Sequence, residues 1–158
     1  MWKTLADNGL PSLDSIGNAR PHLTVAVYDS VSDKDMIQNA VKTVCQSRKP
    51  FNITFTHLGL FTVNDFPVFL STPLSDPLYA VNTVLHEACD KFSLQKWPYY
   101  SLGEWVPHCT LAICGSEAEA GEVVQCAAAL FKPFTARAER IGIAEFYPIT
   151  YWDEWTLQ

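Results

Sequence analysis

The sequence predicts an α+β fold made of two copies of one β-α-β-β unit, related by a pseudo-twofold axis. We expect antiparallel sheets lining a central cleft, with helices on the outside. Two observations predict this fold: a seven-residue segment occurs twice, and similar helix and strand patterns follow each occurrence. The 158 residues suit a single two-lobed domain with its own core. Its repeat units span residues 20–71 and 106–156.

The repeat is clearest in the segment that occurs twice. Residues 21–27 read PHLTVAV and residues 107–113 read PHCTLAI, so the offset from His22 to His108 is 86. A Lys-Pro-Phe sequence at 49–51 returns at 132–134, and Gly59 returns as Gly142, both at an offset of 83. Signals that return in the same order indicate duplication of a whole unit, not of one motif.

Each copy is expected to follow the same path of elements. Apolar and β-branched runs predict strands at 21–28, 51–61, 66–71, 107–113, 134–146 and 149–156. Apolar residues at helical spacing predict helices at 33–47, 77–92 and 117–131. Asp33 and Asp76 are the expected caps of the first two helices, and Pro77 suits a first turn.

The first copy lacks an element that the second has. A strand and a helix precede the strand of His108, whereas only a short helical segment at 2–8 precedes the strand of His22. We therefore expect one sheet edge to be short or to be filled by a partner molecule, with a homodimer as one possibility.

Composition excludes several classes of protein. The chain is 48% hydrophobic and 18% charged, which is typical of a folded globular protein and not of a disordered one. Its net charge of -6 argues against clamping a long duplex, but not against binding a nucleotide or an RNA end. No apolar run reaches the length of a membrane span, and the first residues do not resemble a secretion signal.

The cysteines indicate the compartment. Their number is odd and no C-x-x-C pair occurs, so we expect small buried thiols in a reducing, cytoplasmic setting. They are Cys45, Cys89, Cys109, Cys114 and Cys126.

The His-x-Thr sequence in each copy carries the chemistry. Side chains alternate along a strand, so His22 and Thr24 are expected on one face, and His108 and Thr110 on one face of the equivalent strand. Two such strands side by side would present two imidazoles and two hydroxyls to one cleft. Histidine transfers protons near neutral pH, so one ring can act as base and the other as acid on a phosphodiester. The threonine hydroxyls can donate to phosphate oxygens.

With these motifs, the chain resembles the two-histidine (2H) phosphoesterase superfamily. More narrowly, it resembles the bacterial 2'-5' RNA ligase and cyclic phosphodiesterase group, over about residues 10–156. The resemblance implies a bilobal fold, no metal or other cofactor, and action on 2',3'-cyclic phosphates or 2'-5' linkages of RNA or nucleotides. It also implies that His22 and His108 are catalytic and that Thr24 and Thr110 bind phosphate. The chain departs from the family at its N-terminus, where members usually begin with a strand.

Other residues leave alternatives open. The aromatic segment 97–105 leads into the second motif, and Tyr100 and Trp105 either stack a base or cover the junction of the lobes. His57 is expected to be structural, although it could reach a phosphate. His86 lies in a helix without a second histidine at zinc-ligand spacing, so we expect no metal site.

Four functions remain in competition. Water attack on a cyclic phosphate would make the protein a cyclic phosphodiesterase, and attack by an RNA 5'-hydroxyl would make it a 2'-5' RNA ligase. A module that holds RNA ends without turnover is the alternative from another class. A metal-dependent hydrolase is a weaker rival, because no cluster of carboxylates accompanies either motif.

Overall fold

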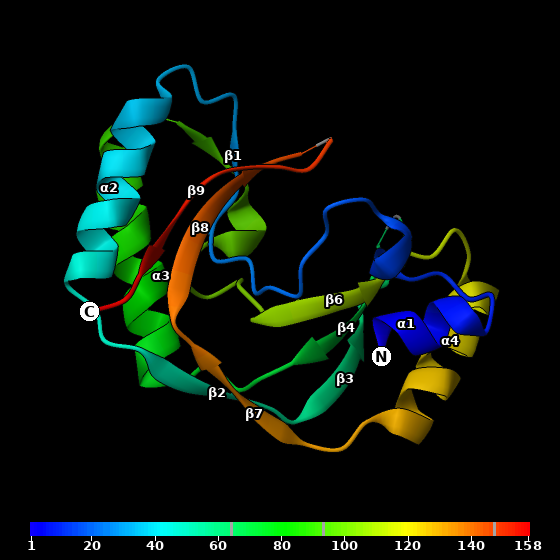
Figure 1. Ribbon diagram of the computed structural model, residues 1–158. Helices are drawn as coiled ribbons and strands as arrows, with labels where there is room; N and C mark the ends of the chain where they lie inside the picture. Colours follow the sequence, from blue (N-terminus) through cyan, green and yellow to red (C-terminus); the bar gives the residue numbers. More distant parts are fainter. Residues whose placement is uncertain (64, 93, 147) are drawn as a thin grey trace. The chain divides into compact units, whose positions relative to one another are not determined.

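Helices and small antiparallel sheets alternate along the chain in the computed structural model, which confirms the α+β prediction (Figure 1). It describes residues 1–63, 65–92, 94–146 and 148–158. The chain forms two compact units, and each draws segments from both sequence repeats. Unit 1 consists of residues 1–23, 54–73 and 107–135. Unit 2 consists of residues 24–53, 74–106 and 136–158.

Unit 1 contains a three-stranded antiparallel sheet in the order β3-β4-β6. Figure 1 shows these strands lying side by side, with α4 beside them. The strands are β3 (His57–Leu60), β4 (Val68–Ser71) and β6 (His108–Ala112). The helical elements are α1 (Trp2–Asp7), the 3-10 turn η1 (Leu13–Ser15) and α4 (Glu117–Leu130). Ser116 caps α4 by accepting a hydrogen bond from the Glu119 backbone N–H.

Unit 2 pairs two long helices with a twisted hairpin. Asp33 caps the first helix as expected, because its side chain accepts from the Met36 backbone N–H. The helices are α2 (Lys34–Gln46) and α3 (Asp76–Cys89), followed by the 3-10 turns η2 (Asp90–Phe92) and η3 (Pro98–Tyr100). The strands are β1 (Tyr28–Asp29) paired with β5 (Gln95–Lys96), and β8 (Arg140–Glu145) paired with β9 (Thr150–Thr156).

Two expected strands are each broken at one residue. The strand predicted at 51–61 divides at Thr56 into β2 (Phe51–Phe55) and β3, and the strand predicted at 134–146 divides at Glu139 into β7 (Phe134–Ala138) and β8. Thr56 and Glu139 are 83 residues apart, the offset of the repeat. At each break the chain changes partner, since β2 and β7 pair with each other whereas β3 pairs with β4 and β8 with β9. The break is therefore a repeated feature of the duplicated unit.

Each unit has its own apolar core. The core of unit 2 lies between α2, α3 and the end of β9, and its buried members are Ile37, Val41, Val44, Cys45, Leu85, Cys89 and Leu157. In unit 1 the buried apolar residues come from the sheet and from the helices around it. They include Leu5, Leu13, Val68, Phe69, Leu70, Leu111, Ala112, Ala120, Val123 and Ala127.

The strand predicted at 21–28 is wrong, because regular pairing begins only at Tyr28. Side chains from elsewhere in unit 2 donate hydrogen bonds to backbone carbonyls of this segment, where a neighbouring strand was expected to do so. The Thr24 carbonyl accepts from Trp105 Nε1, and the Val25 carbonyl accepts from Asn82 Nδ2. Backbone groups bonded in this way need no strand ladder.

The start of α3 agrees with the prediction in one respect and differs in another. Asp76 is the first residue of α3 and not its cap, which is Ser75, while Pro77 stands in the first turn as predicted.

All five cysteines are free, and three of them are fully buried. None of the helices in the described ranges is long and apolar enough to cross a membrane. Before Tyr28 the chain forms only α1 and η1, and the predicted homodimer stays a prediction.

Candidate active site

His108 begins β6 and lies in a cross-strand row of unit 1. The register pairs His108 with Ser71 on β4, and Ser71 with His57 on β3. Directly opposed residues in antiparallel strands share a face, so His57, Ser71 and His108 point to the same side of the sheet. Ser71 is the small residue between the two imidazoles, and its hydroxyl donates to the Pro107 carbonyl at 3.0 Å.

Two phenylalanine rings pack on the His108 imidazole. The Phe61 ring meets it edge-on with centroids 5.1 Å apart, and the Phe69 ring lies 5.0 Å from it. The two phenyl rings are 4.3 Å apart, so the three rings form one cluster. Gly59 makes room for it, because a Cβ at that position would overlap the Phe69 ring. Packing on this scale fixes the orientation of the imidazole.

Thr110 occupies the next position on the same face as His108. It pairs with Phe69, and its side chain is half-buried. The Thr110 carbonyl accepts a hydrogen bond from Trp2 Nε1 at 3.0 Å, which holds α1 against β6. The expectation that His108 and Thr110 share one face of a strand is therefore confirmed.

His22 is exposed and lies beside the second motif. Its main chain makes a hydrogen bond with the Cys109 thiol, whose pKa is raised by burial and lowered to a lesser degree by that bond. Its Nδ1 is 2.6 Å from the Arg20 carbonyl oxygen. A carbonyl only accepts, so Nδ1 carries the proton and Nε2 is the nitrogen left to exchange a proton with a ligand. The two His-x-Thr segments thus meet at His22 and Cys109.

Thr24 stands at the start of unit 2, two residues after His22. The structure places it with the aromatic segment, because the Thr24 carbonyl accepts from Trp105 Nε1 at 3.1 Å. The indole is only 6% exposed, so a base could stack on it only after a movement. Tyr100 is half-buried, and burial raises the pKa of its phenol. Base stacking by Tyr100 or Trp105 stays a prediction.

Asn82 is a positioning residue that the sequence did not reveal. It is fully buried on α3, and its Nδ2 donates to the Val25 carbonyl at 3.1 Å and to the Tyr100 carbonyl at 3.0 Å. One side chain thereby joins the segment after the first motif to the segment before the second. An asparagine inside an otherwise apolar helix face was the available signal, since a buried amide needs partners.

His86 supports the same segments and is not arranged as a metal ligand. It is buried, its Nε2 lies 2.9 Å from the Tyr100 carbonyl and its Nδ1 lies 3.1 Å from the Tyr28 hydroxyl. Because the carbonyl only accepts, Nε2 donates to it, and Nδ1 shares the second hydrogen bond with the Tyr28 hydroxyl. No group of three His, Cys, Asp or Glu side chains able to hold a metal occurs among the described residues.

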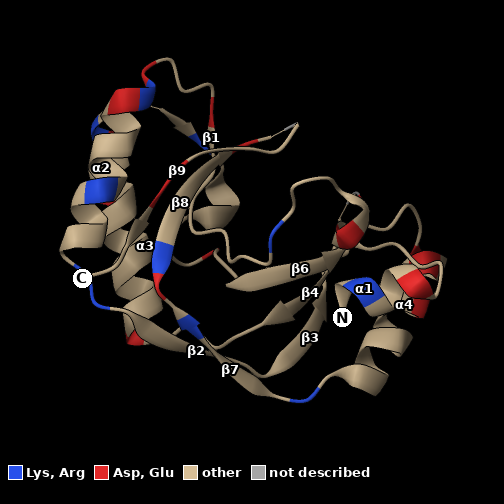
Figure 2. Ribbon diagram, viewed as in Figure 1, with Lys and Arg blue, Asp and Glu red and all other residues tan. Residues whose placement is uncertain are grey.

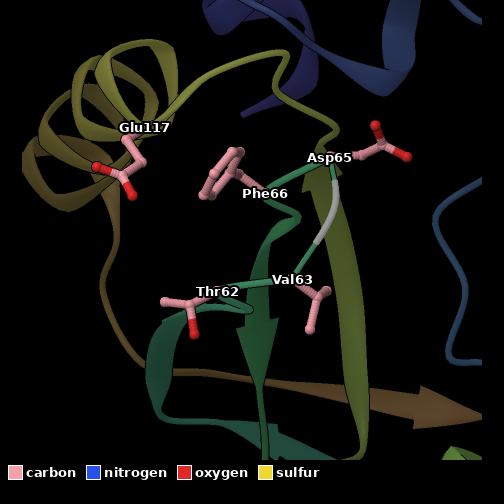
Figure 3. A pocket seen from close by; sticks show the side chains of 5 residues that line it. All are labelled: Thr62, Val63, Asp65, Phe66 and Glu117. Carbon is pink, nitrogen blue, oxygen red and sulfur yellow. The ribbon is translucent and has the colours of Figure 1, made fainter.

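A hollow in unit 1 lies away from His108. It opens at the turn between β3 and β4, next to Cys114, whose backbone N–H donates to the Asp65 carbonyl. Figure 3 shows Phe66 pointing toward Glu117 and the Asp65 carboxylate pointing the other way. The five described lining residues include two carboxylates and no histidine, so this hollow does not suit an anion. They are Thr62, Val63, Asp65, Phe66 and Glu117.

The sheet of unit 1 is free of carboxylates. Strands β3, β4 and β6 contain no Asp, Glu, Lys or Arg, and Figure 2 accordingly draws all three in tan. The chain as a whole carries a net charge of -6, which repels phosphate. That repulsion is weakest at a surface without carboxylates, such as this sheet.

Comparisons with known proteins agree with the fold. A model of the 2'-5' RNA ligase superfamily matches residues 4–147. A solved structure titled as a phosphoesterase is 17% identical, with a TM-score of 0.61 over 94% of this chain and 80% of that chain. The structure of the MHV ns2 PDE domain is 15% identical, with a TM-score of 0.53 over 87% of this chain and 74% of that chain. At such identities the likeness shows the fold. No curated protein matches the chain.

Proposed function

Because the chain belongs to the 2'-5' RNA ligase superfamily, we propose that it is a phosphoesterase acting on 2',3'-cyclic phosphates or 2'-5' linkages of RNA or nucleotides. His22 and His108 are the proposed acid and base, and Thr24 and Thr110 bind the phosphate. The observation that carries the proposal is the meeting of the two His-x-Thr segments, where the His22 main chain bonds to the thiol of Cys109, the neighbour of His108.

The chemistry needs two proton transfers, and two imidazoles supply them. One histidine takes a proton from water as the water oxygen bonds to phosphorus. The bond from phosphorus to the ribose 2' or 3' oxygen then breaks, and the other histidine gives its proton to that oxygen. With water, a cyclic phosphate opens to one phosphomonoester, whereas a 2'-5' linkage gives a phosphomonoester and a free ribose hydroxyl. In both cases the enzyme returns to its starting state after one further proton exchange. Nε2 of His22 is suited to either role, because Nδ1 is engaged by the Arg20 carbonyl.

Charge that builds on the non-bridging oxygens needs donors. The Thr110 hydroxyl belongs to a residue on the same sheet face as His108, and Thr24 follows His22 at the same spacing. Hydroxyl groups held beside the reacting phosphorus stabilise that charge more in the transition state than in the ground state. Two imidazoles and two hydroxyls therefore supply the proton transfers and the charge stabilisation that the reaction needs without a metal.

The test is turnover in EDTA of a nucleoside 2',3'-cyclic phosphate, an oligoribonucleotide ending in a cyclic phosphate, and a 2'-5'-linked dinucleotide. The proposal expects a phosphomonoester product from at least one substrate. Joining of a 5'-hydroxyl RNA to the cyclic end would identify the ligase reaction. Binding of the RNA end without any product would favour the module that only holds RNA ends and would overturn the proposal.

A further inference from the structure

His57 faces the same side of the unit 1 sheet as His108, two strands away. The register places His57 opposite Ser71 and Ser71 opposite His108. Neighbouring strands lie just under 5 Å apart, so the two histidine backbones are separated by about 10 Å. Both side chains extend from the same face, and the one residue between them is a serine whose hydroxyl is held by Pro107.

The His57 ring is placed to meet a ligand. It is exposed, and its Nδ1 makes a 2.8 Å hydrogen bond with Thr56 Oγ1. That contact holds the ring and leaves Nε2 facing a ligand. When the Thr56 hydroxyl donates to Nδ1, Nε2 carries the N–H that can donate to a phosphate oxygen. The strands around it contain no carboxylate that would repel an anion or compete for the donor.

The surface between the two histidines is shaped by Gly59 and Phe69. Gly59 follows His57 on the same face, and the Phe69 ring covers its backbone. The Phe69 ring is itself only 4% exposed, so it is an uncharged wall beside the row of His57, Ser71 and His108 and not a platform for a base. The strands that carry this row contain no charged side chain that would hinder a ligand with a phosphate at each end.

We propose that His57 binds a second phosphate, one nucleotide away from the phosphate that reacts at His108. The preferred ligand is then an RNA end or a nucleotide with a further phosphate on its 5' side, and not a nucleoside carrying the cyclic phosphate alone. This inference rests on the proposed function, because it takes His108 to hold the reacting phosphate.

Binding tests the inference without any need for turnover. We would measure dissociation constants of adenosine 3',5'-bisphosphate and adenosine 3'-monophosphate by calorimetry. Wild type should prefer the bisphosphate by about tenfold or more, since a hydrogen bond to a charged group contributes on that order. His57→Ala should remove most of the preference, and His57→Gln, which keeps an N–H donor, should retain part of it.

A control variant tests whether the preference is specific to His57, and a second pair of ligands distinguishes a free nucleotide from an RNA end. Thr83→Ala, a change at a half-buried position on α3 of unit 2, should keep the wild-type preference. Comparing a 5'-phosphorylated nucleoside cyclic phosphate with a dinucleotide ending in a cyclic phosphate distinguishes a free nucleotide from an RNA end. An equal affinity of wild type for the two adenosine ligands, or a preference that survives His57→Ala, would overturn the inference. Absence of turnover with a bisphosphate preference intact would instead count against the proposed reaction.

Discussion

The Phe69 ring lies over the backbone of Gly59, so closely that a Cβ at position 59 would overlap it. The same ring packs on the His108 imidazole. A glycine on one strand therefore sets the place of an aromatic ring on the next strand, and that ring orients a proposed catalytic histidine two strands away. The lack of a Cβ at position 59 therefore contributes to the orientation of the His108 imidazole.

Gly59→Ala should impair both stability and turnover. The new methyl group must push the Phe69 ring away, and overpacking of this kind costs about 1–3 kcal/mol. We expect a lower urea midpoint and a lower kcat, because the His108 ring loses a packing partner. Gly121→Ala is the matched control, since nothing lies within 4 Å of its Cβ position in α4. It should raise stability by up to about 1 kcal/mol and leave kcat unchanged.

Asn82→Ala should destabilise unit 2. The change removes the donor that serves the Val25 and Tyr100 carbonyls and leaves both without it. Loss of these bonds should lower the free energy of unfolding by about 2–3 kcal/mol, measured by urea denaturation. Thr83→Ala removes only a hydrogen bond within the same helix and should change stability by less than about 0.5 kcal/mol. Equal effects of the two changes would contradict the bridging role of Asn82.

Stability should fall at alkaline pH. Burial raises the pKa of the Cys45 and Cys89 thiols, and burial also raises the pKa of the Tyr28 phenol, assisted by nearby Cys89 and Asp90. Each group holds its proton in the folded state at a pH where the unfolded chain releases it. The stability they contribute is complete below the unfolded pKa, about 8.5 for cysteine and 10 for tyrosine, and is lost as pH rises through the folded pKa.

Urea denaturation at pH 7, 8, 9 and 10 measures this effect. The free energy of unfolding should begin to decrease between pH 8 and 9. Cys45→Ala removes one of the responsible thiols and should make the decrease shallower than in wild type. A profile for Cys45→Ala that runs parallel to wild type would show that this thiol does not contribute.

Trp105→Phe separates positioning from base stacking. The substitution keeps an aromatic ring but removes the Nε1–H that the Thr24 carbonyl accepts. If the indole positions Thr24, kcat should fall by roughly tenfold while KM changes little. Tyr100→Phe is the control, because Tyr100 bonds to Asn82 and His86 through its carbonyl, which this change leaves in place. A raised KM with unchanged kcat in Trp105→Phe would point to contact with the base.

The repeat allowed much of the fold to be predicted. The segments that follow the two motifs were predicted correctly in type, because their apolar periods and the Asp33 cap are local signals. The strand at 21–28 was not foreseen correctly, because the carbonyls of Thr24 and Val25 bond to Trp105 and Asn82, which are distant in sequence. Such tertiary bonds override local β propensity.

The candidate site divides in the same way. The position of His108 and Thr110 on the same face of one strand followed from the alternation of side chains alone. The place of His57 in the row of His108 depended on the register between β3, β4 and β6, which no local pattern specifies. The contacts of Phe61 and Phe69 with His108 could not be predicted from a single sequence either, since they join residues 47 and 39 positions apart.

The most direct test of the account is kcat/KM of His22→Ala, His108→Ala and the double variant on an oligoribonucleotide ending in a 2',3'-cyclic phosphate, in EDTA. All three variants should unfold at temperatures close to wild type. Each single change should reduce kcat/KM by about 10²–10⁴, and the double change should cost little more, because an acid and a base that act in one displacement fail together. A folded single variant with wild-type turnover would contradict the two-histidine mechanism.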